Sequence, residues 1–94
     1  MADVTHTILN GKPRRTKLDI IANMLETTKE GSLKTQIMYK ANLSFTQLNS
    51  YLYFLIENGF VKQTVWNRKE VYFITEKGVD FLQRHSELTR LLKK

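Results

Sequence analysis

A chain of 94 residues with 41% hydrophobic side chains predicts one globular domain built on a single modest core. The absence of cysteine excludes disulfide bonds, thiolate metal sites and cysteine nucleophiles, and no apolar run approaches the ~20 residues that a membrane-crossing helix needs. Fifteen Lys and Arg against nine Asp and Glu leave a net charge of +6, which favours nucleic acid as the partner over an anionic membrane or an acidic protein.

The N-terminal residues 1–13 show no lasting periodicity and are broken by Gly11 and Pro13, so we expect a flexible arm. A basic run, KPRRTK, follows over residues 12–17. Its cations are candidate phosphate contacts at the start of the first helix: Lys12, Arg14, Arg15 and Lys17. A solvated run of charge is the alternative interpretation of the same residues.

The first helix is predicted over residues 16–29. Thr16 is a suitable N-cap, Asp19 places an acid in the first turn, and Gly31 suits the left-handed residue that follows a helix. The apolar positions of the helix are expected to share one buried face: Leu18, Ile20, Ile21, Met24 and Leu25.

A second helix is predicted over residues 33–40, with Ser32 as its N-cap and Ile37 facing inward. Asn42 and Leu43 then form a tight turn, in which Asn42 can adopt the left-handed conformation. A link of about three residues is typical of a helix-turn-helix, in which one helix braces the next against a duplex.

The third helix, Ser44 to Gly59, is the stretch around which the chain is organised, because it begins with a cap and ends with a glycine. Its apolar face is predicted to hold Phe45, Leu48, Leu52, Leu55 and Ile56. The opposite face carries the candidate base-reading residues: Thr46, Gln47, Asn49, Ser50 and Tyr53.

The polar groups of this helix suit adenine and phosphate. The amides of Gln47 and Asn49 can pair with the N6 and N7 edge of adenine, and the hydroxyls can reach bases or phosphates. The helix has no Lys or Arg, so positive charge must come from its flanks: the basic run, Lys34, Lys40 and a following hairpin.

Two segments rich in β-branched and aromatic residues, FVKQTV and VYFIT, predict that hairpin, with residues 66–70 as its loop. Arg68 and Lys69 make its tip basic, which suits contact with phosphates or the minor groove; an ordinary polar turn is the alternative. We expect Trp66 to pack against the domain rather than to stack on a base.

The last helix is predicted from Glu76 to about residue 92, with Thr75 as its cap. Its apolar residues form a short heptad seam that a second copy of the helix would cover: Phe81, His85, Leu88, Leu91 and Leu92. A twofold dimer is the preferred interpretation, and packing back onto the same domain is the alternative.

No catalytic constellation is visible. His6 and His85 lie at opposite ends of the chain, and neither a glycine-rich phosphate loop nor a metal-binding pattern is present. We therefore expect no enzyme activity, no metal, no cofactor and no small-molecule ligand.

The segment KTQIMYKANLSFTQLNSYLYFLIENGFV, followed by a short hairpin and ITEKGVDFL, resembles the small archaeal winged helix-turn-helix DNA-binding proteins. That family includes transcriptional regulators and a chromatin-associated class that dimerises through a C-terminal coiled coil. The resemblance spans about residues 15–82 and implies binding to double-stranded DNA, with the third helix in the major groove.

The predicted fold is α+β and mainly α: a winged helix-turn-helix with a two-stranded wing and an extended C-terminal helix. Its parts are an arm (1–13), a DNA-binding domain (14–82) and a possible dimerisation segment (83–94). The predicted function is that of a dimeric transcriptional regulator, cytoplasmic and nucleoid-associated. Two alternatives stay open, an architectural DNA binder with little sequence preference and a protein-interaction module.

Overall fold

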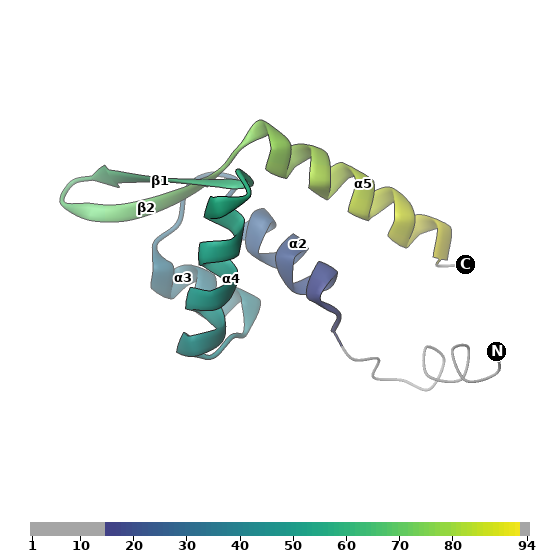
Figure 1. The fold of residues 1–94 in the computed structure, drawn as a ribbon, viewed down its shortest axis with the longest axis horizontal. Helices are drawn as coiled ribbons and strands as arrows, with labels where there is room; N and C mark the ends of the chain where they lie inside the picture. The colour runs from purple at the N-terminus through teal and green to yellow at the C-terminus, as the bar shows by residue number, and fades with distance from the viewer. Residues whose placement is uncertain (1–14, 93–94) are drawn as a thin grey trace.

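The computed structural model of the chain describes residues 15–92. In chain order its elements are α2 (Lys17–Thr27), α3 (Lys34–Ala41), α4 (Phe45–Glu57), β1 (Val61–Trp66), β2 (Lys69–Ile74) and α5 (Glu76–Leu92). Figure 1 shows α2, α3 and α4 gathered at the centre, with the β1–β2 hairpin projecting to one side and α5 extending to the other. The predicted α+β, mainly helical class, with a two-stranded wing and a long last helix, is confirmed. The predicted arm and two of the predicted phosphate contacts, Lys12 and Arg14, lie outside the described residues.

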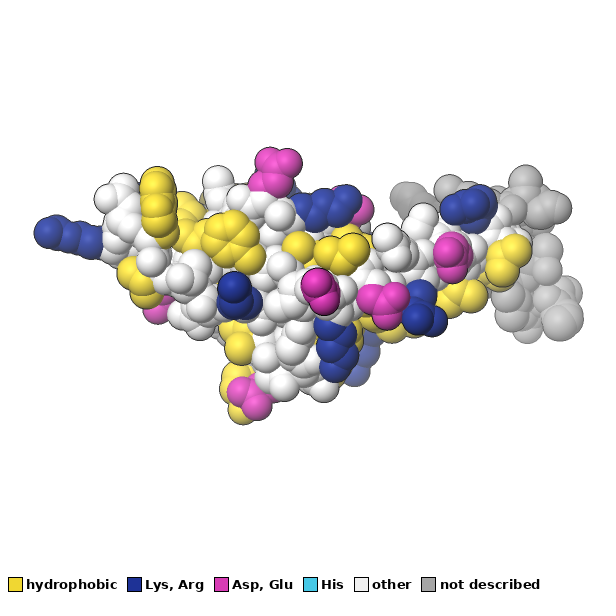
Figure 2. Space-filling view, turned by 90° about the horizontal axis from the view of Figure 1, so that it is seen from above, with side chains coloured by type: hydrophobic (Ala, Val, Ile, Leu, Met, Phe, Trp, Pro, Cys, Tyr) yellow, Lys and Arg dark blue, Asp and Glu magenta, His cyan; other side chains and the backbone are white. Residues whose placement is uncertain are grey.

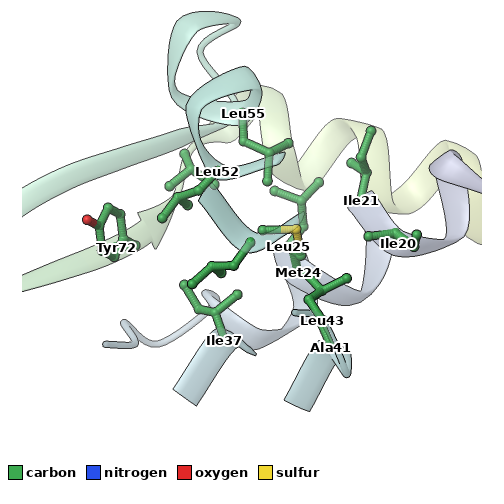
Figure 3. Close-up of a cluster of buried hydrophobic side chains, with 12 residues drawn as sticks. Ile20, Ile21, Met24, Leu25, Ile37, Ala41, Leu43, Leu52, Leu55 and Tyr72 are labelled. Carbon is green, nitrogen blue, oxygen red and sulfur yellow. The ribbon is translucent and has the colours of Figure 1, made fainter. Parts of the chain in front are cut away.

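The core lies where the inner faces of α2, α3 and α4 meet the base of the hairpin (Figure 3). Met24, Leu25, Ile37 and Leu55 have no exposed surface. Burying one such side chain contributes roughly 1.5–3 kcal/mol, so this cluster fixes how the three helices pack. None of the helices within residues 15–92 has the length and apolar character that crossing a membrane requires.

Two residues predicted to be buried are exposed. Leu18, at the second position of α2, is 53% exposed. Phe45, at the first position of α4, is 64% exposed. Its ring lies beneath the Lys34 ammonium, whose nitrogen is 5.9 Å from the ring centroid, rather than in the core.

The connection between α2 and α3 differs from the prediction. Helix α2 ends at Thr27 with Thr28 as C-cap, earlier than expected, although Gly31 does take a positive φ of 90°. Ser32 does not cap α3: its backbone N–H donates to the Tyr72 carbonyl at 3.0 Å, and its carbonyl accepts from the Tyr72 N–H at 2.9 Å. The connection therefore lies along β2 as a short third edge of the hairpin.

The hairpin has a shorter turn than the five residues predicted. The strands pair antiparallel from Val61 with Ile74 to Trp66 with Lys69, which leaves only Asn67 and Arg68 between them. Both take positive φ angles, 55° and 66°, as the two-residue hairpin turns that follow strand twist require. The strands consequently extend as far as the basic tip.

Hydrogen bonds connect the start of α5 to the residues that directly follow α4. The Thr75 hydroxyl accepts from the Gly78 N–H at 3.2 Å, as the predicted cap requires, and donates to the Gly59 carbonyl at 2.6 Å. The Lys77 ammonium donates to the Asn58 carbonyl at 2.8 Å. A Cβ at Gly78 would stand 2.5 Å from the Phe60 carbonyl oxygen, so only glycine allows this close approach.

Helix α5 also packs against α2 through part of the predicted dimerisation seam. The Phe81 ring meets Phe60 edge-on at 5.6 Å between centroids and stacks on His85 at 6.2 Å. His85 Nε2 lies 3.1 Å from Asp19 Oδ1. These two seam residues are thus half-buried against their own domain, as a packed histidine would be. The other seam residues are exposed, by 57%, 75% and 79%: Leu88, Leu91 and Leu92.

The Asp19 carboxylate connects the start of α2 to α5. The Thr16 N–H donates to it, and this bond is the main reason that its pKa falls below the ordinary 3.8; His85 lowers it further, while burial opposes the shift. A carboxyl group whose pKa is lower in the folded state stabilises the fold above its unfolded pKa. That contribution disappears as the pH falls through the folded value.

Asp19→Asn should therefore flatten the acid side of the stability profile. We expect the unfolding free energy of the native chain to fall between about pH 5 and about pH 2 more than that of the variant. The difference should stay under about 1 kcal/mol, because the carboxylate is partly exposed. Urea unfolding at a series of pH values measures it. Asp80→Asn, which changes an acid paired only within α5, is the matched control. Parallel profiles for the native chain and the Asp19 variant would contradict the assignment.

Candidate nucleic-acid interface

The outward face of α4 is the candidate reading surface. Burial of Leu48, Leu52 and Leu55 turns the opposite side of the helix to solvent. Of the predicted base-reading residues, Asn49 is half-buried and the other four are exposed: Thr46, Gln47, Ser50 and Tyr53. The helix thus presents hydroxyl groups and an aromatic ring along its outer side.

Two shallow hollows flank this face. On one side, Thr46, Gln47 and Ser50 line a hollow with Lys17 at the start of α2. On the other side, Asn49 and Tyr53 line a hollow shared with α3 and the hairpin, whose further members include Lys34, Gln63, Glu70 and Tyr72. Each hollow therefore places a lysine beside the predicted base-reading residues.

The N-terminus of α4 engages one of the predicted reading groups. Gln47 Oε1 accepts from the Ser44 N–H at 3.0 Å, while the Gln47 N–H donates to Ser44 Oγ at 3.1 Å. This reciprocal capping box explains why the helix begins at Phe45. Because pairing with adenine needs the amide oxygen as well as the amide nitrogen, Gln47 would have to give up its cap to make that pair.

The turn before α4 is held by a residue predicted to contact phosphate. Arg15 Nη1 donates to the Ala41 carbonyl at 2.7 Å, and Nη2 donates to the Asn42 carbonyl at 3.2 Å. Asn42 takes the predicted left-handed conformation, with φ 56° and ψ 57°. The guanidinium thus satisfies carbonyls at the C-terminus of α3, where the helix dipole favours a cation. Sequence reasoning missed this role, because the partners are 26 residues apart.

The remaining predicted cations surround α4 without lying on it. Lys34 and Lys40 lie at the two ends of α3, and Arg68 and Lys69 lie at the hairpin tip. No Lys or Arg occurs between Phe45 and Glu57. Positive charge is therefore available to hold a polyanion around the helix, while the surface of the helix itself stays neutral to weakly acidic.

An acidic group in the hollow beside Tyr53 was not among the predicted site residues. The Tyr72 hydroxyl donates to Glu70 Oε1 at 3.2 Å. Burial raises the pKa of Tyr72, and the neighbouring carboxylate adds to the shift, so the hydroxyl stays protonated and keeps donating. Glu70 consequently places fixed negative charge where a phosphate would be repelled and a base amino group accepted.

Large apolar side chains are also exposed on α4 and at the hairpin tip. Tyr53 is 67% exposed and Phe54 is 44% exposed on α4. Trp66 is 71% exposed at the end of β1, so the prediction that it packs against the domain is wrong. Within the described part of the chain, no group of three or more His, Asp or Glu is placed to hold a metal ion.

The chain matches a known protein family over most of its length. The model of the winged helix-turn-helix family matches residues 14–93. The uncharacterized protein MJ0287 of Methanocaldococcus jannaschii is 36% identical over 84 residues, which cover 88% of this chain and 82% of that protein.

Solved structures show the same fold at low identity. Sso10a-2, a DNA-binding protein from Sulfolobus solfataricus, superposes with a TM-score of 0.75 at 23% identity, covering 82% of this chain and 81% of that one. TubR from Bacillus thuringiensis serovar israelensis, solved bound to 24 bp of tubC, gives a TM-score of 0.64 at 17% identity over 92% and 91% of the chains. The winged-helix architecture implied by the sequence is thereby confirmed.

Arg15→Ala should act mainly on stability. We expect the unfolding free energy to fall by about 0.5–1.5 kcal/mol, since two carbonyls at the end of α3 lose their donor. Lys17→Ala removes the same charge from an exposed neighbour and should change stability by no more than about 0.5 kcal/mol. Urea unfolding followed by circular dichroism measures both. Equal losses in the two variants would show that charge, and not the hydrogen bonds, is responsible.

Proposed function

The chain belongs to the winged helix-turn-helix family, and from that premise we propose that it binds double-stranded DNA as a dimeric transcriptional regulator located with the nucleoid. The observation that carries the proposal is the neutral outer face of α4 with cations on its flanks. The major groove, ~12 Å wide, admits an α-helix, and a helix there is held by phosphate contacts from its surroundings.

In the proposed complex α4 enters the major groove with its exposed face toward the base edges: Thr46, Ser50 and Tyr53. Lys17 and Lys34, in the two flanking hollows, and Lys40, at the end of α3, contact phosphates beside the groove. Arg68 and Lys69 contact the next stretch of backbone from the hairpin tip. Arg15 contributes chiefly by holding the turn that orients α4.

A second candidate, architectural binding with little sequence preference, is favoured by the state of the two amides. Gln47 is engaged in the capping box, and Asn49 is half-buried. These are the groups best suited to select adenine, so base discrimination by α4 would be modest. Competition between a duplex selected in vitro and random duplex separates the candidates, since equal competition indicates the architectural function. The exposed Tyr53 and Phe54 instead favour a protein-interaction module, which requires no response to duplex DNA.

Affinity for duplex DNA should fall steeply with salt. Each phosphate neutralised contributes roughly 0.9 to the slope of log affinity against log salt concentration. Lys34→Ala and Arg68→Ala should each weaken binding to all sequences alike and reduce the slope by about 1. Arg84→Ala is the matched control, because Arg84 is paired with Asp80 on α5. Fluorescence anisotropy titrations at several salt concentrations give the slopes, and a flat salt dependence would sink the proposal.

The dimer should depend on the exposed leucines of α5. Joint replacement of Leu88 and Leu91 by Ser removes apolar surface that a second copy of the helix would cover, and we expect a shift from dimer to monomer in sedimentation equilibrium. Gln83→Ser, an exposed polar position on the same helix, is the control. A native chain that stays monomeric at every concentration would rule out this dimer, while leaving DNA binding by the single domain open to the salt titration.

A further inference from the structure

The hairpin tip carries a large apolar side chain that stays largely exposed. Trp66 is the single tryptophan of the chain and is 71% exposed at the last position of β1. Its neighbour Val65 is 68% exposed. Tryptophan is a costly residue to leave in water, and it is enriched where one molecule binds another. Exposure at the end of a projecting hairpin therefore indicates contact with a partner.

The geometry of the turn puts this ring beside positive charge. Trp66 pairs directly with Lys69, and paired residues of an antiparallel ladder project on the same face of the sheet. Only Asn67 and Arg68 separate them. The tip thus combines an aromatic ring, an ammonium on the same face and a guanidinium in the turn itself. Figure 2 shows a basic side chain reaching out from the end of the hairpin, with hydrophobic side chains close behind it.

The base of the hairpin is hydrogen-bonded to the rest of the domain. Ser32 exchanges two backbone hydrogen bonds with Tyr72, and the Ile74 N–H donates to the Thr28 carbonyl at 3.0 Å. Tyr72 is also buried in the core. From Val71 toward the turn, the strands pair only with each other among the described residues. An arm held at its base and narrow at its tip is suited to insertion.

We propose that the hairpin tip enters the minor groove and that Trp66 wedges between two base pairs, stacking on one of them, while Arg68 and Lys69 neutralise the adjoining phosphates. This inference rests on the proposed DNA binding and specifies the DNA conformation that the hairpin tip binds. Apolar side chains inserted from the minor groove partly unstack a step and kink the duplex by about 20–90°. Pyrimidine–purine steps, TA above all, unstack most easily, so the tip selects such steps without base-edge hydrogen bonds.

The single tryptophan reports on its own environment. Titration of the native protein with a duplex of random sequence and with one carrying TA steps should quench the Trp66 emission, since stacking on a base brings the indole into direct contact with it. The same duplexes labelled at both ends should show increased energy transfer as they bend. Both signals should be stronger with the TA-containing duplex.

Two variants test the ring itself, and a third is the control. Trp66→Ala should weaken binding roughly 5- to 150-fold, the range for loss of one base–aromatic stack, and should abolish the bend. Trp66→Phe should retain part of both. Val65→Ala removes a similarly exposed side chain from the opposite face and should leave the bend intact. Because Trp66 is exposed, these variants should unfold at the same urea concentration as the native chain.

The outcomes separate the wedge from DNA binding as such. Salt-dependent binding of the native chain, with unchanged Trp66 emission and a Trp66→Ala variant that binds and bends DNA normally, overturns the wedge and leaves the proposed function in place. A tip that serves a protein partner would give that same result with DNA. Failure of the native chain to bind any duplex overturns both.

Discussion

Burial of the inner face of α4 is the constraint on which the rest of the structure depends. Leu48, Leu52 and Leu55 are 1%, 3% and 0% exposed, and they pack with the α2 and α3 side chains that line the same core. Since residues on a helix follow one another at about 100°, burying these three fixes the direction of every other side chain on α4. The candidate reading face is therefore a consequence of the core. Any substitution that rotates α4 would disturb stability and recognition together.

Charge is arranged differently from apolar surface. The core determines where α4 points, but the cations that could hold DNA lie on α2, α3 and the hairpin. Arg15 shows that a basic residue near the site need not bind a ligand, because its guanidinium is spent on two carbonyls at the turn. Glu70 adds a local negative charge between hairpin and helix. In the proposed complex, phosphate contact and base selection would thus be performed by different elements.

Features that depend on a few neighbouring residues could be predicted from the sequence, and those that depend on distant partners could not. The caps at Thr16, Ser44 and Thr75 involve residues three positions apart, and the left-handed Asn42 is a property of one residue. The bond from Arg15 to Ala41 and that from His85 to Asp19 span 26 and 66 residues, so no local pattern indicates them. The two-residue turn was not predicted, because arginine rarely takes a φ of 66°. The exposure of Trp66 was not predicted either, because the residue types of a strand do not show which of its positions the rest of the domain covers.

The bridge between Ser32 and Tyr72 has a consequence for the shape of the whole molecule. It ties the hairpin to the connection between α2 and α3, so the hairpin cannot swing independently of the helices that support α4. The distance from the outer face of α4 to the hairpin tip is then set by the backbone hydrogen bonds at the hairpin base. In the proposed complex with DNA, this fixed span would set how far apart the contacts of α4 and of the hairpin tip can lie. A duplex whose shape matches the span, or deforms to it easily, would be bound more tightly.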